Sequence, residues 1–273
     1  MCPSDSIQIG WLVRIYNELR LLHPNWYVEF GSRCGDGWIP GDALRRPDIP
    51  PFDDLLARIG YRLMTTDRKV IAASFALRFG WSAGAAVAPY LLKLCVPDVT
   101  LDNVSLKFST QTFFEKLSLH DSDAIVLDES RDHIAGVGPG PALAAALRTT
   151  LVRQAEPVVS ALHQWSRFSA RAIWGQIASS WGAQFTSVLG HLGRHVEALK
   201  QARIFFDVPG FIGGMSPKFY AVTHHDLTRI YHRRASCCLY YRLPTGNYCA
   251  SCPLIPQAES ILRNKEWIEK TIA

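Results

Sequence analysis

The protein has 273 residues, of which 48% are hydrophobic and only 19% charged, with 8 Trp, 9 Tyr and 13 Phe. These apolar side chains suffice for a large packed core, which excludes an intrinsically disordered chain and a disulfide-stapled miniprotein. The formal net charge is +5, from 29 Lys and Arg against 24 Asp and Glu. This excess is too small for a protein that binds nucleic acid through a basic face, so no nucleic-acid partner is expected.

The N-terminal residues predict an amphipathic helix rather than an export signal. Apolar residues recur at helical spacing from Ile7 to Leu22, and Ser4 is placed to cap this helix. A basic region followed by a continuous apolar region is missing, so a cytoplasmic protein is expected, with peripheral attachment to the inner membrane as an alternative. The most apolar stretch, 81–95, is shorter than the roughly 20 residues of a membrane-spanning helix, and no transmembrane segment is expected.

The next part of the chain changes from turns and short helices to strands. Residues 23–51 are rich in turn formers, and helical spacing returns over 55–63. Alternation of apolar and polar residues over 96–127 predicts a small central β-sheet. The glycines and prolines of 136–141 indicate a linker that ends in the first turn of a helix. They disfavour a phosphate-binding loop, because the glycine spacing differs from Gly-x-Gly-x-x-Gly and two prolines lack an N–H donor.

The middle of the chain predicts packed helices. An apolar stripe over 143–162 indicates a long helix with a kink at Pro157, and helical patterns continue to about Phe206. Trp174 and Trp181 share one helix face and are expected in the core, with a ligand-facing aromatic wall as the alternative.

Residues 207–217 contain many turn formers and predict a hinge. The expected fold is therefore α+β and mostly helical, with a small central sheet in residues 1–216 and a C-terminal subdomain over 217–273. Within the first part, His191 and His195 have the spacing of a helical metal-binding pair, but position 192 is not Glu and no third ligand is suggested nearby. A surface or packing role is expected for both histidines.

Four of the seven cysteines are crowded into the C-terminal subdomain. They follow the pattern Cys-Cys, ten residues, Cys-x-x-Cys, and are Cys237, Cys238, Cys249 and Cys252. Four thiolates are the usual ligand set of a [2Fe-2S] cluster or of structural zinc, and the turn formers over 244–247 allow the two pairs to meet. Disulfides would require an oxidising compartment. The adjacent pair fits zinc poorly and is better tolerated by two irons, so the cluster is favoured while zinc stays open. Cys34 and Cys95 are expected to be ordinary thiols, and Cys2 lies near the terminus.

This cysteine run resembles the C-terminal signature of the FhuF family of ferric siderophore reductases. The four cysteines match one for one, as do the neighbouring Arg234, Leu239–Arg242 and Pro253–Leu254. The resemblance implies a [2Fe-2S] cluster held by the four cysteines and implies one-electron reduction of siderophore-bound Fe(III). It makes 1–216 a siderophore-recognition domain and 217–273 a cluster-binding subdomain. A hydroxamate is the favoured type of siderophore.

The residues around the cysteines suggest how the charge of such a cluster would be balanced and where its electrons would come from. Arg233, Arg234 and Arg242 are candidates for compensating the negative charge of the cluster or for docking an acidic donor, although a solvated basic face is the alternative for each. No flavin or nicotinamide site is evident, so a ferredoxin or an NAD(P)H-dependent reductase is expected as a separate electron donor. No catalytic residue beyond the cluster ligands is predicted. The competing functions are a non-catalytic siderophore-binding protein with a structural four-cysteine zinc site, and a plain electron carrier.

Overall fold

The computed structural model describes residues 10–121, 124–126, 133–134 and 138–272. Its α-helices are α1 (Trp11–Leu22), α2 (Phe52–Arg62), α3 (Arg68–Gly80), α4 (Gly84–Lys93), α6 (Pro141–Ser166), α7 (Ala170–His191), α8 (His195–Phe206) and α9 (Gln257–Ile272). Its strands are β1 (Glu29–Phe30), β2 (Trp38–Pro40), β3 (Cys95–Pro97), β4 (Val104–Phe108), β5 (Phe114–Leu119), β6 (Ala124–Val126), β7 (His133–Ile134), β8 (Gly138–Pro139), β9 (Lys218–His224) and β10 (Leu227–Arg233). The fold is α+β, as predicted. The expected cap at Ser4 and the helical position of Ile7 lie outside the described residues.

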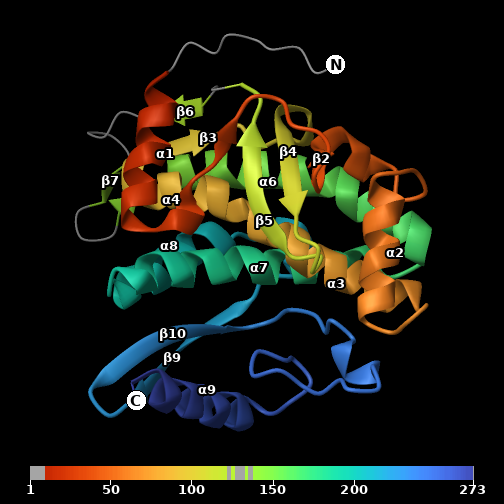
Figure 1. Cartoon of the computed structure of the whole chain (residues 1–273). Coiled ribbons are helices and arrows are strands. Elements are labelled where there is room, and N and C mark those ends of the chain that lie inside the picture. The colour runs from red at the N-terminus through yellow and green to blue at the C-terminus, as the bar shows by residue number, and fades with distance from the viewer. Residues whose placement is uncertain (1–9, 122–123, 127–132, 135–137, 273) are drawn as a thin grey trace.

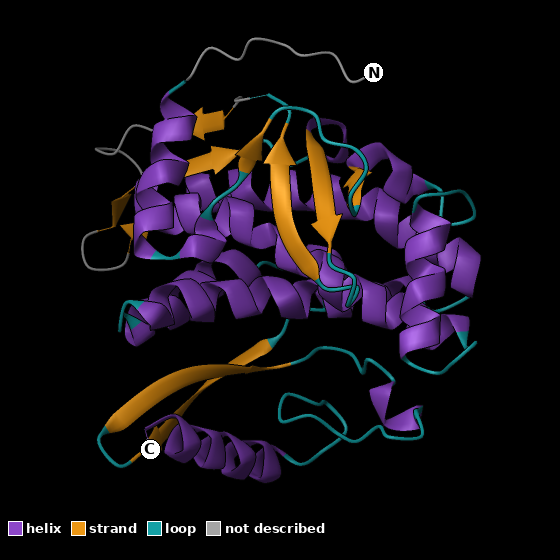
Figure 2. Ribbon diagram, viewed as in Figure 1, coloured by secondary structure: helices purple, strands orange, loops and turns teal. Residues whose placement is uncertain are grey.

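A four-stranded sheet lies on one side of the helices, in the order β1-β5-β4-β2 (Figures 1 and 2). β1 is parallel to β5, whereas β4 is antiparallel to both β5 and β2. The strand predicted over 104–108 is β4. β5 also lies within the predicted sheet region 96–127, and β3 and β6 from the same region form a separate pair. The prediction for 23–51 included only turns, whereas β1 and β2 stand there among the turns. β1 and β2 are too short to show a pattern of their own, and pairing with β5 and β4 defines them.

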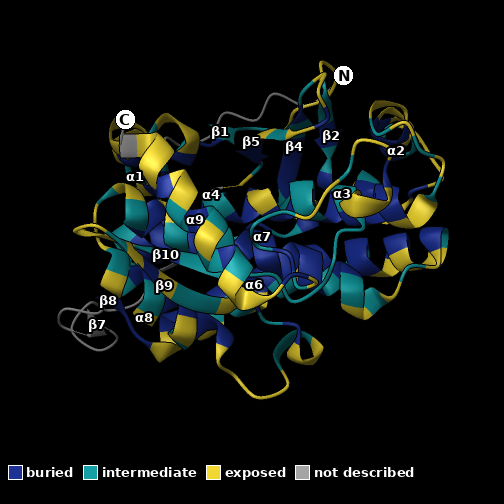
Figure 3. Ribbon diagram, turned by 90° about the horizontal axis from the view of Figure 1, so that it is seen from below, coloured by how far each residue is buried: buried dark blue, intermediate teal, exposed yellow. Residues whose placement is uncertain are grey.

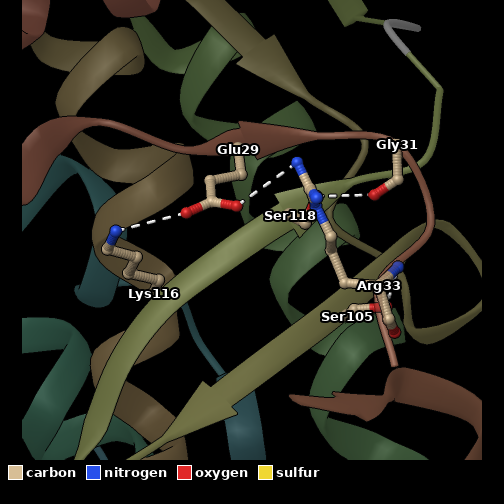
Figure 4. Close-up of polar contacts among 6 residues, drawn as sticks. All are labelled: Glu29, Gly31, Arg33, Ser105, Lys116 and Ser118. Atoms are coloured by element: carbon tan, nitrogen blue, oxygen red, sulfur yellow. Dashed lines mark hydrogen bonds and ion pairs between the residues drawn. The ribbon is translucent and has the colours of Figure 1, made fainter. Parts of the chain in front are cut away.

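Polar contacts fix the short strand β1 at the edge of this sheet (Figure 4). The Glu29 carboxylate lies 3.2 Å from Lys116 Nζ and 3.4 Å from an Arg33 guanidinium nitrogen. Below it, Ser118 Oγ donates to the Gly31 carbonyl at 2.6 Å and Ser105 Oγ to the Arg33 carbonyl at 2.9 Å. Two serines that point inward from β5 and β4 thus satisfy backbone carbonyls that the short strand leaves unpaired.

Helix α7 is the central helix of the protein. It lies between the upper helices and the C-terminal strands, and it appears mostly buried in Figure 3. Apolar and small residues occur all round it, as expected for a helix with neighbours on every side. Small residues permit close packing: a Cβ on Gly80 of α3 would lie 2.7 Å from Ser180 Cβ of α7. Trp181 is fully buried and meets Trp174 edge to face, with ring centroids 6.1 Å apart, which confirms the packing role.

The other helical predictions divide into confirmations and corrections. Helix α6 begins at Pro141 as expected and continues through Pro157 to Ser166. The apolar stretch predicted over 81–95 overlaps a longer one. Arg68–Lys93 forms a run of 26 helical residues that is long and apolar enough to cross a membrane. However, 67% of its most apolar window is buried inside the protein, as is typical of a core helix.

The C-terminal part begins after the turn formers predicted as a hinge. α8 ends at Phe206, and the glycine-rich segment Phe211–Gly214 is a short 3-10 turn with left-handed backbone. β9 and β10 then form an antiparallel hairpin that lies below α7, and α9 covers the hairpin from the other side (Figure 1). His224 Nε2 lies 2.7 Å from Glu269 Oε1 of α9, and Asn264 Nδ2 donates to Tyr220 Oη at 2.8 Å. Both contacts hold α9 to the hairpin.

One residue of the hairpin is expected to make stability depend on pH. Burial, together with the positive charge of Arg234, lowers the pKa of His232 to about 4. The folded protein keeps this imidazole neutral, whereas the unfolded chain takes up a proton near pH 6.5, so stability falls as the pH drops below that value. Between pH 7 and pH 5 we expect His232 to lower the free energy of unfolding by about 2 kcal/mol. Urea unfolding of the protein and of its His232→Gln variant at both pH values measures this difference. Equal losses in the two proteins would contradict the prediction.

Candidate metal centre

The four cysteines of the C-terminal run line a single cavity of about 250 Å³. Cys237 and Cys238 follow β10, whereas Cys249 and Cys252 lie in the loop that leads to α9. Cys252 is buried and the other three are half-buried. The structure therefore brings together four thiols that are separated by up to 15 positions in the sequence (237 to 252).

Backbone hydrogen bonds bring the two cysteine pairs together. Arg234 N donates to Ser251 O at 2.9 Å, which ties the end of β10 to the Cys-x-x-Cys loop. That loop is closed by a turn, with Cys252 N donating to Cys249 O at 3.0 Å. The predicted turn between the pairs is confirmed: Gly246 N donates to Leu243 O at 2.9 Å. Only glycine fits there, because a Cβ at Gly246 would lie 1.8 Å from the Tyr240 carbonyl oxygen.

Two of the sulfurs accept hydrogen bonds from the backbone in the same local arrangement. Leu239 N donates to Cys237 Sγ at 3.3 Å, and Leu254 N donates to Cys252 Sγ at 3.5 Å. In each case the donor lies two residues after the cysteine, at a turn. Leu239 has a left-handed backbone, with φ of 62°, and stands at the start of the 3-10 turn Tyr240–Arg242. Such N–H donors stabilise a thiolate and, around an iron–sulfur cluster, raise its reduction potential.

The electrostatics of the cavity favour a bound cation. Burial raises the pKa of Cys237 to about 11, and the neighbouring Cys238 and Cys252 raise it as well. Four thiolates therefore repel one another in a space that is partly shielded from water. A metal centre removes this cost, because coordination replaces the thiol protons and neutralises the charge. The donor set fits a four-thiolate group.

The spacing of the four sulfurs can be compared with the spacing that a single zinc ion would require. Among the described residues, no three of these sulfurs form a group with all three atoms within 4.8 Å of one another, although His224 and His225 of the hairpin do so with Glu269 of α9. Four thiolates on one tetrahedral zinc with Zn–S bonds near 2.3 Å would all lie about 3.8 Å apart. A wider spread suits a centre that contains two irons.

Comparison with known protein families agrees with this donor set. Residues 234–254 match the family model described as the FhuF 2Fe-2S C-terminal domain. Residues 234–254 are therefore similar to this domain, and we refer to them as the FhuF-type domain. This match confirms both the predicted resemblance and the predicted [2Fe-2S] cofactor. No curated protein matches the chain.

The part of the chain before residue 217 is called the body below. Its helices α2 and α3, with the residue that follows α2, form a wall of the cavity beside the cysteine loop. Leu63, Val70, Ser74 and Leu77 line it together with the cysteines. The cavity therefore takes residues from both sides of the boundary predicted at 216/217. The boundary itself stays a prediction.

The three arginines expected to serve the cluster lie in different surroundings. Arg233 donates to the carbonyls of Pro253 and Ile255 at 2.7 and 2.5 Å, so it holds the loop after the last cysteine. Arg242 forms an ion pair of 3.1 Å with Asp67, the residue that caps α3. Arg234 alone among them lines the cysteine cavity. Charge compensation or donor docking stays a prediction for all three, and Arg234 is the best placed for the former.

The sequence did not predict the residues that line a second cleft, in the body next to the cysteine cavity. A second cleft, of about 530 Å³, adjoins the cysteine cavity and is lined by Arg62, Arg78, Trp81 and Phe113, among others. Arg62 ends one helix and Arg78 lies near the end of the next, while Phe113 is in the turn before β5. They are far apart in the sequence and match no spacing rule. The only local signal is that arginine interrupts the apolar run of α3.

We expect that the position of Cys237 depends on a glycine in α7. A Cβ on Gly175 would lie 2.5 Å from Ser236 Oγ and 2.8 Å from Ser236 Cβ, directly beside Cys237. Gly175→Ala should lower the free energy of unfolding by about 1–3 kcal/mol through overpacking, and should also lower the iron content. Thermal unfolding and iron analysis measure both effects.

A matched control lies on the same helix. At Gly190 the nearest atom to an added Cβ is His195 Cε1, at an ordinary 3.4 Å. Gly190→Ala should be neutral or stabilising by up to about 1 kcal/mol, because alanine favours helix more than glycine does. Equal stability and equal iron content in the two variants would contradict the prediction.

Proposed function

We propose that the protein reduces siderophore-bound Fe(III) to Fe(II) by one electron and thereby releases iron in the cytoplasm. Cys237, Cys238, Cys249 and Cys252 are the proposed ligands of the [2Fe-2S] cluster. The observation that supports this most directly is the convergence on one cavity of all four thiols of the segment that is similar to the FhuF 2Fe-2S C-terminal domain. The bound cluster supplies the electron chemistry, since it changes oxidation state by one electron.

The protein's own residues have three tasks in this reaction. The N–H groups of Leu239 and Leu254 stabilise negative charge on two of the proposed ligands. Arg234 places a guanidinium on the wall of the cysteine cavity, where positive charge favours the reduced, more negative state. The body brings the ferric chelate next to that wall. Release then follows from the chemistry of the product, because hard oxygen donors bind Fe(II) far more weakly than Fe(III).

The electron enters from a separate protein in this proposal, either a ferredoxin or an NAD(P)H-dependent reductase. Tyrosines at the rim of the cysteine cavity leave an approach from solvent, since Tyr241 and Tyr248 are both partly exposed. Their rings lie 5.1 Å apart and line the cysteine cavity but not the adjoining cleft. A donor that docks over them would reach the centre without passing the ferric chelate.

The ligand assignment predicts a clear result for single serine variants. Replacing any one of the four cysteines by serine, for example Cys238→Ser, should abolish the EPR signal of the reduced protein and strongly lower iron and labile sulfide. Cys34→Ser is the matched control, because Cys34 is exposed and lies outside the cavity. Retention of a full cluster in Cys238→Ser would remove that residue from the ligand set.

The reaction itself is tested with the reduced protein under anaerobic conditions. Reduction should bleach the visible absorption, and addition of a ferric siderophore should restore it while Fe(II) appears in equal amount, trapped by a ferrous chelator. Zinc without iron or sulfide in the purified protein would instead support a structural site. A reduced cluster that reacts with no ferric chelate would rule out the reductase function and leave an electron carrier.

A further inference from the structure

The cleft next to the cysteine cavity has the composition of a ligand site. It measures about 530 Å³, within the usual range for pockets that hold small molecules. Its lining includes three arginines and four aromatic residues. The two spaces adjoin, because five residues line both of them: Leu63, Ser74, Leu77, Arg234 and Tyr240. A molecule in this cleft would therefore lie next to the cysteine cavity.

The positive charge of the cleft is not balanced by the protein. In the described part of the chain, Arg62, Arg78 and Arg234 take part in none of the ion pairs, in contrast to Arg242 with Asp67. Arg78 Nε is buried and has no hydrogen-bond partner, while its Nη1 bonds to Ser74. Burial and the charge of Arg62 lower the pKa of Arg78 to about 10. A partly buried cation without a counter-ion is costly, so the cleft favours an anion.

The aromatic residues of the cleft present flat apolar surfaces beside these charges. Trp81 is 46% and Phe113 56% exposed, although both are large apolar side chains. The guanidinium of Arg78 lies over the Phe113 ring, 5.0 Å from its centroid. Exposed aromatic faces interleaved with cations suit a ligand that carries both negative charge and aromatic rings. An acidic protein partner would instead need a broad open surface.

We propose that this basic cleft binds the ferric chelate and selects chelates with net negative charge and aromatic rings, tris-catecholates before trihydroxamates. The inference rests on the proposed ferric reductase function and names its substrate class. A ferric tris-catecholate carries three negative charges and three rings, whereas a ferric trihydroxamate is neutral and lacks rings. Reduction adds a further negative charge to the bound chelate, which the three guanidiniums also favour. The cleft thus points away from the hydroxamate that the sequence favoured.

Binding of gallium(III) chelates tests this proposal without any electron transfer, because gallium(III) is redox-inert. The oxidised protein with its cluster is titrated with a hexadentate gallium tris-catecholate and, separately, with a gallium trihydroxamate, by calorimetry. The catecholate should bind at least about tenfold more tightly, and its affinity should fall as salt is added.

Variants locate the site. Arg62→Gln removes an exposed cleft arginine and should weaken catecholate binding about tenfold, with cluster content unchanged. Phe113→Ser should also weaken it, because it removes the exposed ring. Arg58→Gln is the matched control, since Arg58 is exposed on the same helix one turn earlier and lies outside the cleft lining. It should bind like the unaltered protein.

The outcomes separate this inference from the proposed function. The cleft proposal is overturned by equal or tighter binding of the trihydroxamate, by unchanged catecholate affinity in Arg62→Gln and Phe113→Ser, or by variants that impair only electron uptake from a ferredoxin. If neither gallium chelate binds but the reduced protein still reduces ferric chelates, the cleft proposal fails and the function stands. If the catecholate binds as expected but no ferric chelate is reduced, the function fails and the cleft remains a binding site.

Discussion

Partial burial of four neighbouring sulfurs is the constraint on which the functional part of this protein depends. Burial raises the pKa of Cys237, and the neighbouring Cys238 and Cys252 raise it further, because each thiol that ionises makes the next harder to ionise. Backbone N–H groups of Leu239 and Leu254 donate to two of the sulfurs, and Arg234 lines the cavity. In our proposal these groups stabilise negative charge on the sulfurs, and so favour both the assembly of the [2Fe-2S] centre and its acceptance of one more electron.

The same constraint explains why the cysteine segment needs the rest of the chain. The loop that carries the thiols has no regular structure beyond the short 3-10 turn Tyr240–Arg242, so contacts with neighbouring elements fix its position. Ser236 packs against Gly175 of α7, Arg242 pairs with Asp67 at the start of α3, and Arg263 of α9 bonds to the Tyr248 carbonyl. The loop that carries the sulfurs is therefore held by contacts with three helices, α3, α7 and α9.

Positive charge is organised around one residue. Arg234 faces the cysteine cavity on one side and the basic cleft on the other, where Arg62 and Arg78 add to it. In our proposals the electron leaves one side of this guanidinium and arrives on the other, and both the cluster and the chelate are negatively charged. A cation between two anions reduces their repulsion and permits close approach. In our proposals the wall that the two spaces share, which includes Arg234 and Tyr240, thus connects the chemistry of the cluster with the recognition of the substrate.

The sequence by itself determined the features that depend on neighbours along the chain. The helical stripe of α6, the strand β4, the turn at Gly246 and the cysteine pattern of the FhuF-type domain are all of this local kind. Only the tertiary structure decided the pairing of β1 and β2 with the sheet, the α2–α3 wall of the cysteine cavity, and the cleft that joins Arg62, Arg78 and Phe113. These residues meet through the packing of α3 on α7 and of the β4–β5 turn beside it. The spacing of apolar residues along the chain does not predict such contacts, because they depend on how whole helices and strands pack and not on the pattern within a single element.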